Sequence, residues 1–308
     1  MVSTFSSLET VRRALFASQT AIQTTGHNIS NANTEGYSRQ RVNLTTTTPY
    51  PSVGFNRPQI PGQIGTGVQA DSVQRIRDEF VDTQVRQEAT KTGYWQSKSD
   101  AISQMEDIMN EPTDQGLSSV LNDLWNSLQD LADNPNNSGA RSVVRQRATT
   151  VADTFHYLSN SLETIRDNIG NQIDVTTQQI NSIAKQINEI NKQIAKVEPN
   201  GYVANDLYDQ RDVLVDQLSQ LANVTVKKNP SGGNAEAIAD GTYTVNITGT
   251  NANGETITYT LVDGKNFKVN NFEVNTDGTT PTYSVGGQEL QNVSGKIQGL
   301  AESYTQDY

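Results

Sequence analysis

The sequence contains no cysteine, few aromatic residues and no long hydrophobic run. The absence of cysteine excludes disulfides, thiol catalysis and zinc sites with Cys ligands. No stretch is apolar enough to span a bilayer, so we expect no membrane insertion. The N-terminus also lacks the basic and apolar regions of a cleaved secretory signal. An extracellular location would therefore require another export route.

Positive charge is scarce as well, with 23 Lys and Arg against 34 Asp and Glu, a net charge of -11. Because the chain has no basic run and no basic patch interleaved with aromatics, we expect no nucleic-acid partner. Hydrophobic residues make up only 34% of the 308 residues. This composition favours elongated helical stems, with narrow apolar seams and wide polar faces, over one compact globule.

Catalytic signals are equally sparse. The only histidines are His27 and His156, and the chain has neither a Gly-x-Ser-x-Gly nor a His-Glu-x-x-His motif. A Ser-His-Asp arrangement is formally possible in a Ser-rich chain. However, His27 falls at a helix end, where it can meet the last carbonyls, and His156 falls on a coiled-coil helix. We therefore predict a non-enzyme with no cofactor and no metal.

The first helix is predicted over residues 4–29, because Leu8, Leu15, Ile22 and Ile29 recur seven apart. Its polar face carries Ser, Thr and Gln with few basic residues. A helix that lies on a membrane surface usually carries many more Lys and Arg. The pattern therefore favours a seam for partner helices.

A polar turn follows this helix, and residues 31–39 read Asn-Ala-Asn-Thr-Glu-Gly-Tyr-Ser-Arg. Asn, Thr and Gly disfavour a helix interior, and Gly36 takes a positive φ at low cost. An apolar/polar alternation around Val42 and Leu44 then predicts a strand. The turn by itself predicts a helix end and the entry to a hairpin.

Four more helices are predicted over residues 76–110, 117–133, 139–197 and 204–222. The third would be roughly 90 Å long at 1.5 Å per residue, so it requires a stalk. A stutter in its seam falls at Gly170. We expect the seams of the first three, including Trp95, Ile102, Leu121 and Leu128, to pack against one another.

Residues 223–293 change to a period of two, with turn dipeptides such as Asn253-Gly254 and Asp263-Gly264. The predicted fold is mainly α with a β-rich domain: an elongated bundle of long antiparallel coiled-coil-like helices plus a small antiparallel β domain. The predicted division is an assembly helix and turn (1–36), a β-like connector and stem (37–222), the β domain (223–293) and a return toward the stem (294–308).

One carboxylate cluster stands out, because Asp206, Asp209, Asp212 and Asp216 fall on one side of the 204–222 helix. A metal site is one interpretation, but calcium prefers loop oxygens and no such loop is evident. We instead predict a solvated face, with Arg211 pairing to a neighbouring helix.

The turn and its position after an N-terminal helix resemble the signature of bacterial flagellar axial proteins, the subunits of rod, hook and hook–filament junction. Residues 67–80, the Asn-Asp-Leu-x-Asp-Gln-Arg-Asp segment at 205–212 and residues 295–302 are similar to the hook-associated branch of that family. The assembly residues are expected in the seam and the turn: Leu8, Leu15, Ile22, Ile29, Asn31, Asn33, Thr34, Gly36, Tyr37 and Arg39.

The resemblance implies an extracellular structural subunit that joins hook to filament by helix packing of its terminal regions. It implies as partners copies of the same chain in a ring, hook subunits, the next junction protein and the flagellar type III export apparatus. Members of the family continue into C-terminal helices that pair with the N-terminal ones, and we expect this chain to stop before them. The alternatives are a stalked adhesin or ligand-binding module that uses the β domain, and an enzyme within that domain.

Overall fold

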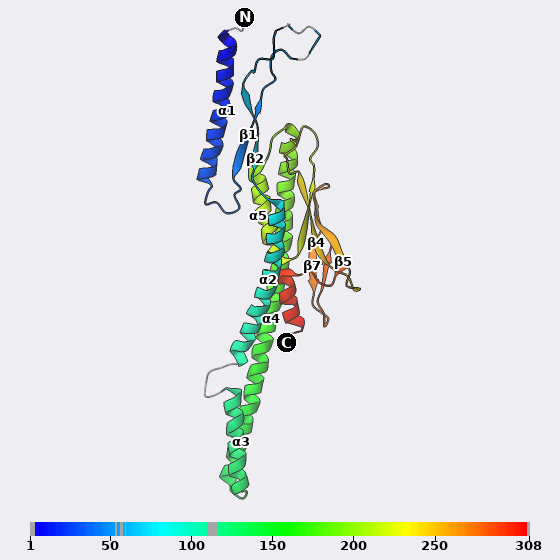
Figure 1. The fold of residues 1–308 in the computed structure, drawn as a ribbon. Coiled ribbons are helices and arrows are strands. Elements are labelled where there is room, and N and C mark those ends of the chain that lie inside the picture. Colours follow the sequence, from blue (N-terminus) through cyan, green and yellow to red (C-terminus); the bar gives the residue numbers. More distant parts are fainter. Residues whose placement is uncertain (1–3, 53, 56–57, 59, 110–115, 307–308) are drawn as a thin grey trace.

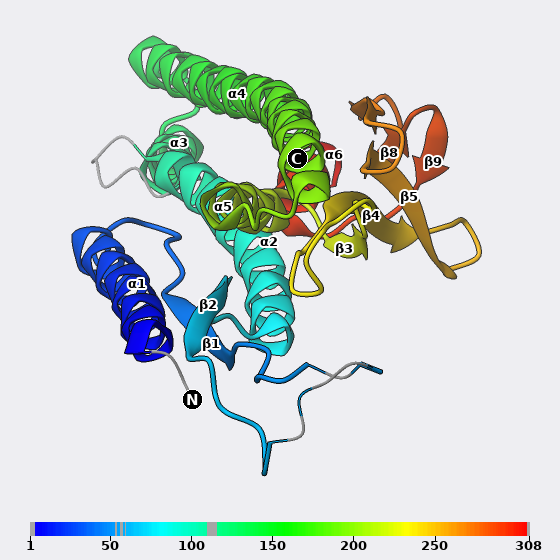
Figure 2. The same ribbon diagram turned by 90° about the horizontal axis from the view of Figure 1, so that it is seen from above.

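The computed structural model describes residues 4–52, 54–55, 58, 60–109 and 116–306. The molecule is elongated, with an N-terminal arm at one end and a pair of antiparallel helices at the other (Figure 1). A β domain lies beside the middle of the helical stem, on the side away from the first helix (Figures 1 and 2). The predicted fold class, long helices plus small antiparallel sheets, is confirmed.

Five predicted helices lie close to the observed bounds, and a sixth ends the described chain. The helices are α1 Thr4–Ser30, α2 Glu79–Met109, α3 Leu117–Asp133, α4 Ser138–Val197, α5 Asn205–Leu221 and α6 Gly295–Thr305. The largest difference is at the start of α2, which we predicted at residue 76. There the Asp78 carboxylate accepts from the Phe80 amide at 2.9 Å and so caps the helix later. The predicted end at residue 110 lies outside the described residues.

The arm consists of α1, the turn after it, and an antiparallel hairpin of β1 Gln40–Thr46 and β2 Val68–Arg75. The hairpin lies between α1 and the stem (Figure 2). The hairpin packs against α1 through both strands. These contacts join the hairpin to α1, and the predicted division at residue 36 stays a prediction.

The β domain contains two antiparallel sheets. The first has the order β3 Val224–Asn229, β4 Thr242–Thr250, β5 Thr256–Asp263, β6 Lys268–Val269, and the second β7 Phe272–Asn275, β8 Thr282–Val285, β9 Gln288–Leu290. The predicted turns at Asn253-Gly254 and Asp263-Gly264 each join two antiparallel strands. The inner faces of the sheets share one apolar core with α4, α5 and α6.

Three asparagines on α4 hold the β domain to the stem. Asn191 donates to the Tyr243 carbonyl at 2.8 Å and accepts from the Tyr243 amide at 2.9 Å. Asn181 makes the same two bonds with Phe272, each at 2.8 Å. Asn188 donates to the Phe267 carbonyl at 3.0 Å. These side-chain amides take the place of a neighbouring strand for backbone groups that would otherwise be buried without partners.

The stem packs differently from our prediction. Large apolar side chains in the predicted seams of α2 and α3 remain exposed, including those of Trp95, Ile102, Leu121 and Leu128. The contact face of α2 is instead its row of small residues: Thr90, Gly93, Ser97 and Ala101. A Cβ added at Gly93 would lie 2.1 Å from the Gln220 carbonyl oxygen. The small residues let the α2 and α5 backbones approach closely, and the larger side chains are turned outward.

Gly170 has a similar role on α4, which runs unbroken through the predicted stutter. A Cβ at this position would lie 3.2 Å from the Tyr304 ring of α6. The glycine therefore makes room for the helix that packs beside it. Among the residues described, no helix is long and apolar enough to cross a membrane.

Candidate functional site: the arm–stem junction

The first helix turns its apolar seam away from the rest of the molecule. Leu8, Leu15, Ile22 and Ile29 are 64% to 72% exposed, whereas Ala17 on the opposite face is buried. This opposite face packs on the hairpin, where Arg13 donates to the Thr66 carbonyl at 3.3 Å. In a globular protein the apolar stripe faces the core, so α1 has the reverse orientation.

The turn after α1 is closed by a side chain that our sequence reading did not single out. The Asn28 amide oxygen accepts from the Gln40 amide and the Tyr37 hydroxyl, each at 2.8 Å, and its nitrogen donates to the Gln40 carbonyl at 2.8 Å. Asn31 donates to the His27 carbonyl at 3.1 Å. Asn28 therefore joins the last turn of α1 to the first residue of β1.

The other motif residues lie along this turn. Thr34 donates to the Asn31 amide oxygen at 3.2 Å, and Asn33 is exposed. The Arg39 side chain is exposed, while its carbonyl accepts from the Ile76 amide at 2.8 Å and extends the hairpin ladder. The motif thus shapes the turn with part of its residues and presents others to solvent.

Gly36 lies at a close approach of the turn to the stem. Its φ of 77° lies in the left-handed region. An added Cβ would lie 2.0 Å from Val213 Cγ2 on α5. The Ser38 amide then donates to Asp209 Oδ2 at 3.1 Å, and the Gln40 side chain donates to Asp206 Oδ1 at 3.0 Å. The turn is therefore docked on α5, along the predicted carboxylate cluster.

His27 also faces this cluster rather than the helix carbonyls that we expected it to meet. Its Nε2 lies 3.4 Å from Asp206 Oδ1, and its ring makes an edge contact with the Tyr37 ring. Nδ1 lies 3.3 Å from the Asn31 amide nitrogen. The His27 ring therefore lies between the turn and α5. The Asn31 side chain donates to the His27 carbonyl at the end of α1.

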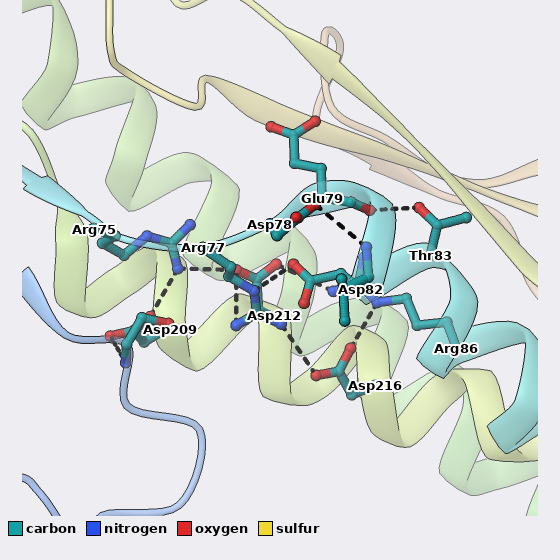
Figure 3. Close-up of polar contacts among 12 residues, drawn as sticks. Arg75, Arg77, Asp78, Glu79, Asp82, Thr83, Arg86, Asp209, Asp212 and Asp216 are labelled. Atoms are coloured by element: carbon teal, nitrogen blue, oxygen red, sulfur yellow. Dashed lines mark hydrogen bonds and ion pairs between the residues drawn. The ribbon is translucent and has the colours of Figure 1, made fainter.

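Three carboxylates of the cluster, Asp209, Asp212 and Asp216, form ion pairs with arginines. These arginines lie between the end of β2 and the first turns of α2 (Figure 3). Arg75 Nη1 lies 2.7 Å from Asp209 Oδ1 and 2.9 Å from Asp212 Oδ2. Arg86 reaches Asp212 at 3.3 Å and Asp216 at 2.6 Å. Arg77 adds a contact of 3.5 Å to Asp212. A polar cavity of about 180 Å³ borders these side chains.

The prediction of a solvated aspartate face is therefore wrong for the middle of α5. The side chains of Asp212 and Arg75 are only 3% and 7% exposed. Burial alone would raise the pKa of Asp212, but the charges of Arg77 and Arg75 outweigh it and lower that pKa. Among the described residues no group of His, Cys, Asp or Glu is placed to hold a metal ion. The arginine partners lie more than a hundred residues earlier in the chain, where the periodicity of α5 cannot reveal them.

Arg211 lies on the same helix and is fully buried. It donates to the Asn191 side chain on α4 at 3.2 Å and to the Gly241 carbonyl at 2.7 Å. The predicted pairing with a neighbouring helix is thus confirmed, but it occurs in the interior. Burial lowers the pKa of this guanidinium. Its charge faces the Tyr243 ring at 3.3 Å and the Tyr208 ring at 5.3 Å.

The fold and the junction define a class: an elongated, helix-rich stalk protein whose N-terminal helix exposes an apolar seam on a docked arm. Comparison with protein families narrows this class. A model described as the flagellar hook-associated protein FlgK helical domain matches residues 102–308. A second model, described as flagella basal body rod protein, matches residues 8–37. The chain belongs to the FlgK family of flagellar hook-associated proteins.

Individual relatives agree with this assignment. The chain is 46% identical to flagellar hook-associated protein 1 of Bacillus subtilis (strain 168), over 99% of the chain and 61% of that protein. It is 31% identical to the Salmonella typhimurium protein of the same name, over 81% of the chain and 41% of that protein. The chain therefore spans less than two thirds of the length of these relatives.

A solved structure supports the fold. The flagellar hook junction protein FlgK from Burkholderia pseudomallei superimposes with a TM-score of 0.54 at 23% sequence identity. The match covers 72% of this chain and 38% of that chain.

Proposed function

We propose that this chain is a structural subunit of the bacterial flagellum that joins hook to filament, with α1 as its assembly helix. The observation that carries the proposal is the outward apolar seam of α1. Each large apolar side chain that leaves water contributes about 1.5–3 kcal/mol. Burying Leu8, Leu15, Ile22 and Ile29 against partner helices would therefore supply a substantial driving force for assembly.

The comparisons support this proposal at the level of the family. The relatives carry the name flagellar hook-associated protein 1, and the solved neighbour is titled a flagellar hook junction protein. The N-terminal match to a basal body rod model covers most of α1 and the turn. This shared segment supports partners that are themselves axial proteins.

The specific partners follow from the same reasoning. We infer as partners copies of this chain in a ring, hook subunits and the next junction protein. We further infer passage through the flagellar type III export apparatus to an extracellular position. No cofactor has a role in such a subunit. His27 belongs to the turn, and His156 is exposed on α4, so we infer no catalytic function.

The experiment is complementation of a strain that lacks the gene for this chain with the whole gene, parent or variant, and filaments are counted by electron microscopy. Leu15→Gln combined with Ile22→Gln should abolish filaments, because both residues lie in mid-seam. The matched control is Val175→Gln, an equally exposed apolar residue on α4 at 63%, which should leave filaments intact. Thermal melting of both variants should match that of the parent. Normal filaments with the double variant would exclude the seam as the assembly surface.

No observation in the structure favours the adhesin alternative, and the comparisons give it no support. That alternative predicts that deletion of the gene leaves flagella intact and reduces attachment only. The same deletion strain therefore separates the two functions.

A further inference from the structure

Asp240 lies in the loop between β3 and β4, yet it contacts the arm. Asp240 Oδ2 lies 2.5 Å from Arg75 Nη2 at the end of β2. Its other oxygen lies 2.5 Å from Lys228 Nζ on β3. Lys228 also forms an ion pair with Glu79, the first residue of α2. The Asp240 carboxylate therefore connects the arm to β3. Through Lys228 of β3 it is also connected to the start of α2 in the stem.

The next residue, Gly241, fixes this part of the loop on the stem. Its carbonyl accepts from Arg211 of α5 at 2.7 Å, and its amide donates to the buried Glu198 carboxylate at 3.0 Å. Gly241 has a φ of 70°, and an added Cβ would lie 2.1 Å from the Asn229 carbonyl oxygen. The position of Asp240 is thus set by the stem and the β domain together.

Arg75 is the arm residue on which these contacts converge. It binds two carboxylates of α5 and the Asp240 carboxylate of the loop, and its guanidinium lies 4.9 Å from the Tyr208 ring centre. Asp209 and Asp212 both come from α5, and both bind Nη1 of the guanidinium. Asp240 comes from a different element and binds Nη2, so it holds the guanidinium from a second side.

We infer that Asp240 is a positioning residue that sets the orientation of the arm relative to the stem and couples it to the placement of the β3–β4 loop. Such coupling is reciprocal, so loosening the loop should loosen the arm, and removing Arg75 should loosen the loop. The inference rests on the proposed function only for its biological meaning, since a fixed arm would present the α1 seam at one defined angle.

The test measures two distances in the isolated chain by electron spin resonance. The chain has no cysteine, so spin labels attach only at introduced positions. One pair, Thr25→Cys with Gln217→Cys, reports arm against stem. The other pair, Ala237→Cys with Gln217→Cys, reports loop against stem. All three positions are exposed.

Asp240→Asn should broaden the arm–stem distribution, and Arg75→Gln should broaden the loop–stem distribution. We expect the displaced population to rise about fivefold or more in each case, the lower end of typical coupling between sites. Asp277→Asn, the same change at an exposed turn of the β domain, should leave both distributions unchanged.

The inference is overturned if Asp240→Asn alters only the loop–stem pair, because Asp240 would then be a local anchor. It is equally overturned if neither pair responds. Should Asp240→Asn prevent folding, Asp240→Glu keeps the charge and adds one methylene, and an arm–stem distance unchanged from the parent would overturn the inference. These distances are independent of filament counts, so failure of the complementation test leaves them interpretable.

Discussion

Asp212 shows how a single side chain joins two distant segments of the chain. Its carboxylate contacts Arg75, Arg77 and Arg86 while it is almost fully buried. Removing one member of a buried ion pair leaves an uncompensated charge, at a typical cost of about 3–5 kcal/mol. We expect Asp212→Ala to lower the free energy of unfolding by about that amount, measured by urea denaturation.

Asp216 is the matched control for this measurement. It lies one turn further along α5 and contacts Arg86 and Arg77, but its side chain is 43% exposed. Exposed pairs contribute about 1 kcal/mol or less, so Asp216→Ala should shift the urea midpoint far less. Equal losses in the two variants would mean that burial does not determine the strength of these pairs.

Asn191 supports the β domain through hydrogen bonds rather than charge. Its side chain pairs with both the amide and the carbonyl of Tyr243, and it also accepts from Arg211. Asn191→Ala would leave these buried groups without partners, at about 1–3 kcal/mol for each unsatisfied group. Arg211 keeps its bond to the Gly241 carbonyl, so two groups of Tyr243 lose their partner, and we expect a total loss of about 2–6 kcal/mol in thermal or urea unfolding.

Gln186 provides the comparison, because it carries the same amide on an exposed position of α4 and bonds only locally to Ser182. Gln186→Ala should change stability by less than about 0.5 kcal/mol. A loss at Asn191 no larger than this would show that solvent satisfies Tyr243 when the side chain is removed.

A turn or helix end can be predicted from the sequence where a local signal determines it. The turn around Gly36 is such a case. The left-handed φ there and the contact with Val213 both require the absence of a Cβ. Gly36→Ala should therefore push the turn away from α5. We expect faster limited proteolysis between α1 and β1 and a lower melting temperature.

Two further variants make this prediction specific. Gly26→Ala on α1 has nothing within 4 Å of the added Cβ, and it should stabilise the helix by up to about 1 kcal/mol. Adding Val213→Ala to Gly36→Ala removes the clashing methyl groups and should restore part of the protection. No restoration would assign the whole effect to the backbone strain at residue 36.

Helix bounds were predictable because apolar periodicity and caps are local properties. The turn dipeptides Asn253-Gly254 and Asp263-Gly264 likewise predicted two hairpins of the β domain. The environment of α5 could not be read in this way, because its burial depends on Arg75, Arg77 and Arg86, which are remote in sequence. A usable signal did exist, since basic residues at the end of β2 complement the charge of the aspartate cluster.

On α5 the sequence predicted exposure where the structure has burial, and on α2 and α3 the error is the reverse. Leucine and tryptophan spacing on α2 and α3 predicted buried faces, but the small residues Gly93 and Ala101 form the contact and Trp95 stays exposed. A helix face can be buried either by close approach of two backbones at small residues or by packing of large side chains. The apolar periodicity detects only the large side chains. Exposed apolar stripes on α1, α2 and α3 are therefore a property of the whole molecule rather than of one helix.

At the scale of the whole molecule, we expect α1 to be the least stable element against local unfolding and the middle of α4 to be the most stable. The isoleucines of α4 from Ile173 to Ile194 are buried against α5, α6 and strands of the β domain. By contrast, α1 buries little beyond Ala17 and is attached mainly through polar contacts of the turn and hairpin. Most helical stability in proteins comes from packing of an apolar face, and α1 packs little of its own, so its opening requires much less free energy than opening of α4.

Amide hydrogen exchange followed by mass spectrometry measures this difference directly. In the isolated chain, peptides from α1 should exchange orders of magnitude faster than peptides from the 173–194 segment of α4. Arg75→Gln should accelerate exchange in the arm while leaving the 173–194 segment unchanged, because that segment does not contact the arginine. Protection of α1 equal to that of α4 would mean that the arm is already stable without partners. The exposed seam would then contribute affinity for a partner surface but no folding of the arm on assembly.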